Sequence, residues 1–168
     1  SFACPIPNKE AVSPKDFHNQ SVNPPVVRAS TIIFKSMSDI RRTQKKYKKD
    51  PRGGFFDYGR QGTSTTHILQ KILTKLEESY HVFLTPTGFG SVFLAIFSVV
   101  RPGDEIIVAD PVYKPTRVLT EDYLKDFNIK TFFYDPKNLK SLEKLITKKT
   151  KLIFVENPGS NTFEFQDL

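Results

Sequence analysis

Residues 105–116 read EIIVADPVYKPT, and this stretch decides the fold class. Its first part, Glu105–Ala109, is apolar after the opening glutamate, as is typical of a strand buried in a parallel sheet. A loop that contains Pro111 follows, and Lys114–Lys125 then carries a helical pattern. The stretch therefore predicts a buried strand, a loop and a helix in immediate succession.

Strands of the same kind recur on either side of this stretch. His81–Leu84 reads as a short strand before it, and Ile129–Tyr134 and Lys151–Val155 read as strands after it. Helical patterns separate them, because Val92–Val100 is apolar on all sides, as in a buried helix, and Asn138–Thr147 has leucines at helical spacing. This alternation predicts an α/β fold with a mostly parallel sheet and helices on both faces.

The N-terminal part of the chain follows a different pattern. Residues 1–30 hold five prolines and little periodicity, which predicts an extended arm. Such an arm must lie on another surface, either within this chain or on a partner subunit. Residues 31–57 are mixed, and a helix is expected after Thr63–Thr65, which offer N-caps before an apolar helical pattern.

Composition narrows the class of protein. A chain of 168 residues with 38% hydrophobic content suits one globular domain. No apolar run approaches the roughly 20 residues that span a bilayer, and the N-terminus lacks the pattern of a secretory signal, so we expect no membrane partner. The single cysteine, Cys4, allows no internal disulfide and is typical of a cytoplasmic protein.

The distribution of charge argues against a nucleic-acid-binding surface, and the positions of histidine and cysteine argue against a metal site. The net charge of +7 is concentrated in Arg41–Arg52 and Lys148–Lys151. Apart from Tyr47 these stretches lack the interleaved aromatic residues of a single-strand binder, so a solvated basic face is favoured over a nucleic-acid surface. The three histidines show no metal-ligand spacing, and Cys4 has no histidine motif beside it.

Candidate binding loops follow the expected strands, where ligands bind in open parallel sheets. Thr87–Ser91 (TGFGS) opens a helix and fits either a phosphate-binding turn or a plain tight turn. Tyr113 either covers a planar ligand or lies on the surface, and Glu156–Asn161 is either a binding loop or a simple Pro-Gly turn. In the earlier cluster Tyr58–Thr63, Arg60 suits a bidentate phosphate contact, although surface arginines are common.

In their order and spacing, these segments together resemble the transsulfuration enzymes, which depend on pyridoxal 5'-phosphate (PLP), and within them the cystathionine β-lyase branch. The resembling part covers most of the chain, from about Val22 to Leu168. The matching pieces are VNPPVVRAST (Val22–Thr31), YGRQGTSTT (Tyr58–Thr66), TGFGS (Thr87–Ser91), RPGDEIIVADPVYKPT (Arg101–Thr116), YDP (Tyr134–Pro136) and ENPGSNTFEFQD (Glu156–Asp167).

The resemblance implies a fold and a set of site residues. The fold would be the large domain of fold-type I PLP-dependent transferases, in truncated form. Backbone N–H groups of Gly88 and Phe89 would cradle the cofactor phosphate. Tyr113 would stack on the pyridine ring and assist proton transfer, and Ser160 would lie near cofactor and substrate.

The resemblance also implies an assembly. Tyr58 and Arg60 would reach across a dimer interface to the phosphate of the neighbouring subunit's PLP, so we expect a homodimer or homotetramer. Residues 1–57 would form the arm and the dimer contacts. Residues 58–168 would form the first, incomplete part of the PLP-binding domain.

By resemblance, the full enzyme would convert cystathionine, or a related sulfur amino acid, to homocysteine, pyruvate and ammonia in methionine biosynthesis. Pro158–Ser160 favours the β-lyase branch, while methionine γ-lyase and cystathionine γ-synthase stay alternatives. Leu168 ends the chain before the family's Schiff-base lysine, so we expect this chain alone to be inactive. A second alternative is a non-catalytic truncated paralogue that acts only by pairing with a full-length subunit.

Overall fold

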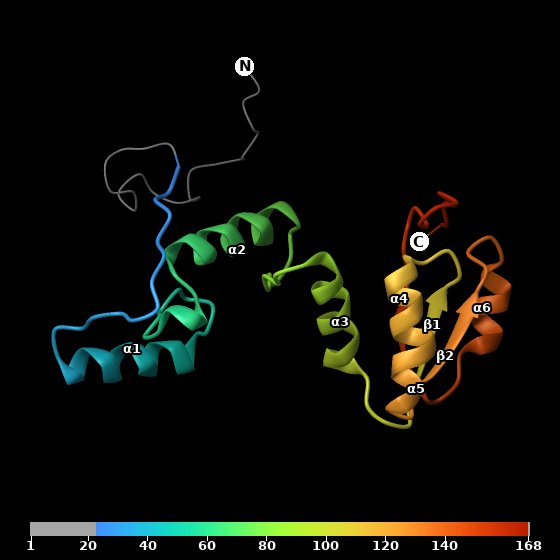
Figure 1. Cartoon of the computed structure of the whole chain (residues 1–168), viewed down its shortest axis with the longest axis horizontal. Helices are drawn as coiled ribbons and strands as arrows, with labels where there is room; N and C mark the ends of the chain where they lie inside the picture. The colour runs from blue at the N-terminus through green and yellow to red at the C-terminus, as the bar shows by residue number, and fades with distance from the viewer. Residues whose placement is uncertain (1–22, 168) are drawn as a thin grey trace, which may run out of the picture. The chain divides into compact units, whose positions relative to one another are not determined.

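The computed structural model describes residues 23–167, which form two compact units that meet in sequence between Leu84 and Thr85 (Figure 1). Cys4 and the first 22 residues of the expected arm lie outside the described residues. The expected functional division into residues 1–57 and 58–168 stays a prediction. The elements are α1 (Met37–Lys49), η3 (Gly59–Gln61), α2 (Ser64–Leu76), α3 (Gly88–Val99), β1 (Glu105–Ala109), α4 (Lys114–Val118), η4 (Leu119–Tyr123), α5 (Leu124–Asp126), β2 (Lys130–Tyr134), α6 (Leu139–Leu145) and β3 (Thr150–Phe154).

Helix α1 occupies the segment that the sequence left as mixed. Ser36 caps its N-terminus by accepting a hydrogen bond from the Asp39 N–H, and lysines fill its last turn, where they complement the helix dipole. A narrow stripe of half-buried residues at helical spacing, Ile40, Thr43 and Tyr47, faces the rest of the first unit. The basic residues on α1 are all exposed, and the absence of a nucleic-acid partner stays a prediction. They are Arg41, Arg42, Lys45, Lys46, Lys48 and Lys49.

Part of the expected arm lies on the start of helix α2. The Val27 N–H donates to Thr65 Oγ1 at 2.8 Å, and the Thr65 hydroxyl donates to the Pro25 carbonyl at 3.0 Å. Thr63 caps the helix through a capping box with Thr66, as its position before the apolar pattern predicts. Residues 25–27 therefore rest on this chain's own first unit.

The second unit is built on a three-stranded parallel sheet with the order β2-β1-β3. β1 is central, with Ile107 opposite Phe132 on one side and Ile153 on the other. All five residues of β1 are buried, because neighbours cover both its edges and both its faces. The parallel sheet expected from the sequence is confirmed.

Helices cover both faces of this sheet. On one face, apolar side chains of β1 pack with residues from α3, η4 and α5, including Ile96, Leu119 and Leu124. On the other face, Ile107, Ala109 and Tyr134 pack against Leu142 and Leu145 of α6. Figure 1 shows α4 and α5 on one side of the strands and α6 on the other.

The helix expected at Lys114–Lys125 contains a π-helical turn. It begins as α4 with Pro115 in its first turn, continues through the wider turn η4 and ends as α5. Leu119 and Leu124, at the starts of η4 and α5, are both buried in the same core. The sequence pattern predicted the helix but not its change of hydrogen-bond pattern.

Helix α3 is less buried than expected. Ile96 and the following Val100 are buried, whereas Phe93 is 45% exposed and Leu94 is 48% exposed. The sheet can take only one side of a helix, and among the described residues the other side of α3 has no full cover. The expectation of a helix buried all round is therefore wrong, although the helix itself is present.

His81–Leu84 is not a strand, contrary to the expected four-strand order. The segment has no backbone ladder with β1, β2 or β3, and a strand needs such a partner to satisfy its N–H and C=O groups. Gln70 instead donates to the Val82 carbonyl at 2.9 Å, so the segment is tied to helix α2. None of the described helices is long and apolar enough to cross a bilayer.

Replacing the core residue Leu124 by alanine tests this packing. Leu124 is fully buried, so Leu124→Ala removes several methyl groups from the core and is expected to destabilise the second unit by about 2–5 kcal/mol. Urea-dependent amide hydrogen exchange in β1 measures this unit separately from the first. Leu139→Ala, at a helical leucine 41% exposed, is the control, and an equal loss in both variants would contradict the assignment of the core.

Candidate functional site

The N-terminus of α3 presents two backbone donors without partners. Thr87 caps the helix by accepting from the Gly90 N–H at 2.9 Å, and its carbonyl accepts from the Ser91 N–H. The N–H groups of Gly88 and Phe89 have no hydrogen-bond acceptor among residues 23–167. A Cβ atom added at Gly88 would meet nothing within 4 Å, so the space beside Gly88 is open.

Tyr113 and Ser160 are held by one carboxylate. The Tyr113 N–H donates to Glu156 Oε2 at 3.1 Å, and the Ser160 hydroxyl donates to Glu156 Oε1 at 2.6 Å. The Ser160 N–H also donates to the Pro111 carbonyl at 2.8 Å. Glu156 thus joins the loop after β1 to the loop after β3. Each of its two carboxylate oxygens accepts a hydrogen bond from one of the two predicted site residues.

The close approach of these loops requires glycine at position 159. A Cβ atom added at Gly159 would lie 2.8 Å from both Cβ and Cγ of Pro111. Gly159 is buried, and its N–H donates to the Glu164 carbonyl at 2.9 Å. The loop that contains Ser160 is therefore packed tightly against the loop that leads to Tyr113.

An apolar cavity of about 520 Å³ is lined by Phe89 and by residues that follow Tyr113 in the sequence. The phenol ring of Tyr113 is 48% exposed, and its hydroxyl has no hydrogen-bond partner among the described residues. The second unit thus brings the predicted residues of α3 and of the β1 loop to one region. The cavity is lined by Phe89, Phe93, Lys114, Pro115, Val118, Leu119 and Tyr123.

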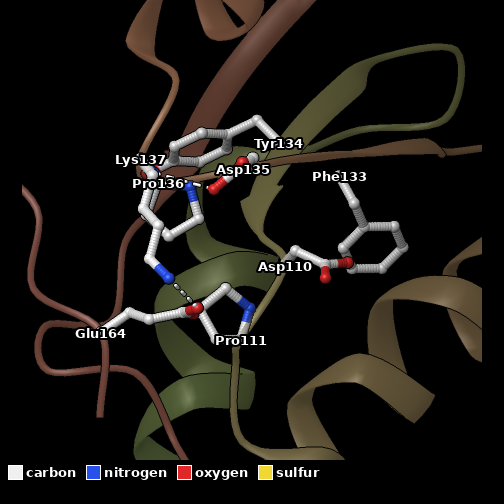
Figure 2. A pocket seen from close by; sticks show the side chains of 8 residues that line it. All are labelled: Asp110, Pro111, Phe133, Tyr134, Asp135, Pro136, Lys137 and Glu164. Atoms are coloured by element: carbon white, nitrogen blue, oxygen red, sulfur yellow. Dashed lines mark hydrogen bonds and ion pairs between the residues drawn. The ribbon is translucent and has the colours of Figure 1, made fainter. Parts of the chain in front are cut away.

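A second, polar cavity of about 350 Å³ opens at the carboxyl ends of β1 and β2 (Figure 2). Figure 2 shows Lys137 reaching toward Glu164, an ion pair of 2.9 Å between Nζ and Oε1, with Asp110 on the other side. Asp110 is ion-paired with Arg117, whose guanidinium also lies over the ring of Phe133. Asp110 and Glu164 are thus paired with cations, and Asp135 accepts a hydrogen bond from the Lys137 N–H. No metal-binding group is found among the described residues.

Behind this cavity, the YDP segment is tied to the C-terminal loop. The Tyr134 hydroxyl donates to Gln166 Oε1 at 2.6 Å, and burial raises the pKa of Tyr134. The Asn157 side chain also holds Gln166 in place. Its amide N–H donates to the Gln166 carbonyl, and its Oδ1 accepts from the Gln166 N–H. These contacts fix the shape of the loop that contains Ser160.

Tyr58 and Arg60 lie in the first unit. Their local fold depends on Gly59, because a Cβ atom there would lie 1.8 Å from the Ala29 carbonyl oxygen. The Gly59 N–H donates to the Ser30 carbonyl at 2.7 Å, and the Arg60 guanidinium lies 5.2 Å from the centre of the Tyr58 ring. Both predicted residues are exposed and lie side by side, but their role across a subunit interface stays a prediction.

Glu156 is the functional residue that sequence reasoning missed. It was counted only as the first residue of a polar loop, although a carboxylate directly after a buried strand is a usable signal. The close contact of Gly159 with Pro111 was not predictable, because it joins loops that lie far apart in the sequence.

Comparisons with known proteins agree on one family. Residues 9–168 match the family model described as Cys/Met metabolism PLP-dependent enzyme. A Saccharomyces cerevisiae protein provisionally named cystathionine beta-lyase is 37% identical over 147 residues, which cover 88% of this chain and 40% of that protein. Cystathionine beta-lyase of Haemophilus influenzae is 34% identical over 154 residues, which cover 92% of this chain and 38% of that enzyme.

A solved structure shares the fold. The Campylobacter jejuni protein provisionally named O-acetylhomoserine (thiol)-lyase has a TM-score of 0.77 and 23% identity, over 94% of this chain and 38% of that chain. Its crystal structure contains N'-pyridoxyl-lysine-5'-monophosphate. The chain thus spans about 40% of the length of the curated relatives described above.

Two glycine substitutions should affect stability differently. Gly159→Ala forces a methyl group against Pro111, so we expect a loss of about 1–3 kcal/mol from overpacking. Gly88→Ala adds the same group in open space and should leave stability unchanged. Hydrogen exchange in β1 measures both, and an undisturbed Gly159→Ala variant would show that the two loops are not in close contact.

The ion pair of Lys137 and Glu164 should give a pH dependence. A hydrogen bond from Lys137 lowers the pKa of Glu164 below its ordinary value of 4.5, and the same bond raises the pKa of Lys137. The pair therefore stabilises the folded state above pH 4.5, and this contribution is lost as the pH falls through the lowered pKa of Glu164.

Lys137→Gln should return the pKa of Glu164 toward its ordinary value and remove this pH dependence. An NMR titration of the Glu164 carboxylate measures the change. Lys140→Gln, on the neighbouring helix α6, is the control with the same change of charge. A Glu164 pKa that is the same in both variants would show that the pair does not form in solution.

Proposed function

Since this chain belongs to the Cys/Met metabolism family of PLP-dependent enzymes, we propose that it supplies the cofactor-phosphate cradle of a carbon–sulfur lyase. The observation that carries this proposal is the pair of N–H groups at Gly88 and Phe89, which lack an acceptor among the described residues and lie beside the open Cβ position of Gly88. PLP as cofactor and the fold-type I architecture, both expected from the sequence, are confirmed by the family match and the shared fold.

The residues fit the cofactor's phosphate. Two free N–H groups at the start of a twelve-residue helix combine hydrogen-bond donors with the favourable end of the helix dipole. Thr87 already satisfies the Gly90 N–H, so the donors that remain are those of the first two residues. Gly88 carries no side chain, and its open Cβ position leaves room beside these two donors.

Tyr113 is proposed to cover the cofactor ring and to move a proton at its Oη. Its exposed ring and unpartnered hydroxyl leave both its face and its oxygen available. Ser160 is proposed to lie beside the cofactor and substrate, because Glu156 holds it on the same carboxylate as the Tyr113 N–H. Bound PLP would supply an electron sink for negative charge that develops on the substrate.

Tyr58 and Arg60 are proposed to bind the cofactor phosphate of a neighbouring subunit in a homodimer or homotetramer. Their side-by-side position presents a phenol hydroxyl and a guanidinium together, and both are exposed. A guanidinium suits a phosphate because its planar fork donates two parallel hydrogen bonds.

We favour cystathionine β-elimination as the reaction of the whole protein, with homocysteine, pyruvate and ammonia as products. The Pro158–Ser160 sequence and the names of the two similar proteins from yeast and Haemophilus influenzae support it. The similar Campylobacter jejuni structure supports a second candidate, an O-acetylhomoserine (thiol)-lyase. A cytoplasmic location remains the prediction from the sequence.

The reaction is tested with the protein from its natural source. Pyruvate released from cystathionine supports the β-lyase, whereas sulfide-dependent use of O-acetylhomoserine, without pyruvate from cystathionine, would overturn it in favour of the second candidate. Neither product from the protein bound to PLP would argue against both lyase reactions.

Gly88→Ala tests the phosphate cradle directly in this chain. The added methyl group would lie beside the Gly88 and Phe89 donors and crowd a bound phosphate, so we expect PLP affinity to fall about tenfold while stability stays unchanged. Titration followed by absorbance of the bound cofactor measures the affinity. Pyridoxal, which lacks the phosphate, is the matched control ligand.

Pyridoxal should bind the wild type and Gly88→Ala chains equally well. If PLP affinity is the same in both chains, Gly88 and Phe89 do not hold the phosphate. If both ligands lose affinity equally, the substitution acts on the ring site and the cradle assignment fails.

A further inference from the structure

The first unit contains a cavity that the proposed lyase chemistry does not use. Its volume is about 390 Å³, within the range of small-molecule sites. Four separate segments supply its walls: α1, the turn after it, α2 with the preceding η3, and residues 80–83. All of these belong to the first unit.

Aromatic rings form much of this cavity. Tyr47, Phe56, Tyr80 and Phe83 line it. Phe56 meets the ring of His67 edge-on, with centroids 5.9 Å apart. Such walls suit a flat apolar group, which ring faces and edges contact over a large area.

Basic side chains also line this cavity. Arg52, His67 and His81 contribute to the lining, and within the described chain no aspartate or glutamate does. The Arg52 guanidinium lies 4.2 Å from the centre of the Tyr80 ring, so its charge is set against an aromatic wall. Asp50 pairs with Arg52 only loosely, at 3.6 Å between Nε and Oδ1.

Four of the polar side chains that line the cavity lack a hydrogen-bond partner in the described part of the chain. The side chains of His67, His81, Tyr47 and Tyr80 have no hydrogen-bond partner among residues 23–167. His67 packs closely against Gly54, because a Cβ atom added at Gly54 would lie 2.5 Å from its Nε2. Imidazole and phenol groups that have no acceptor among the described residues therefore line the same cavity.

We propose that this cavity binds a small aromatic anion, with the flat ring against Tyr47, Phe56 and Tyr80 and the anionic head on Arg52 and the two imidazoles. The ligand class is an aromatic phosphate or carboxylate. The inference is independent of the lyase proposal, because its residues lie in the first unit and take no part in the α3 cradle.

The pKa of His67 depends on its burial and on the charges around it. Burial, then the charges of Lys71 and His81, lowers the pKa of His67, and Asp50 opposes them. Arg52, Tyr47 and Tyr80 are the other titratable groups that line the cavity. A bound anion would offset the repulsion from Lys71 and His81 and return the pKa of His67 toward 6.5.

Histidine NMR of the full chain tests the proposal. Phenyl phosphate is the probe, with inorganic phosphate as the head group alone and benzyl alcohol as the ring alone. We expect phenyl phosphate to shift the His67 and His81 ring signals, to raise the pKa of His67, and to bind more tightly than either half. Benzoate then distinguishes carboxylate from phosphate as the preferred head group, and tighter binding of either supports the site.

Arg52→Gln should weaken phenyl phosphate binding about tenfold, because a charge-assisted hydrogen bond is lost. Arg41→Gln, an exposed arginine of α1 outside the cavity, carries the same change of charge and should leave affinity unchanged. If both variants lose phenyl phosphate affinity equally, the loss comes from the change in net charge alone, and the proposal is overturned. Unshifted His67 and His81 signals at millimolar phenyl phosphate would overturn it as well.

Discussion

Strand β1 is paired along both edges and buried on both faces, and the rest of the second unit depends on this double constraint. A strand with no solvent side has to be apolar, and the sequence from Ile106 to Ala109 meets this demand. Glu105, the exception, is satisfied because the Thr147 hydroxyl donates to its carboxylate at 2.6 Å. The backbone at Ala109 is therefore held in place by the sheet. This position in turn determines where the loop that contains Tyr113 begins.

Glu156 connects the loop after β1 to the loop after β3. Its two oxygens accept from the Tyr113 N–H and from the Ser160 hydroxyl, so both loops are held by a single side chain. A carboxylate that accepts two hydrogen bonds has little freedom left to rotate. Gly159 reinforces this link by letting the loop pack directly on Pro111. The site is thus positioned by contacts between loops, on a scaffold that the sheet makes rigid.

Local patterns in the sequence were enough to predict the parallel sheet, its two helical layers and the loops that bear Gly88, Tyr113 and Ser160. These features rest on periodicity and on turn residues, which neighbours in the sequence determine. Other features depend on residues that lie far apart. The backbone of residues 81–84 lacks a ladder partner, and α3 is covered on one side only, so the expected strand and the expected burial were both wrong. Helix α1 was missed although Ser36 and Asp39 mark its start.

The π-helical turn η4 changes which residues of the helix face the core, compared with a regular α-helix. In an α-helix, residues five apart point about 140° away from each other, because each residue turns the helix by about 100°. Leu119 and Leu124 are five apart and yet both enter the same core, since the wider turn brings them onto one side. Deleting one exposed residue between them, such as Asp122, would leave the leucines four apart, where an ordinary α-helix also puts them on one face. Homologues one residue shorter in this helix would therefore keep the same core.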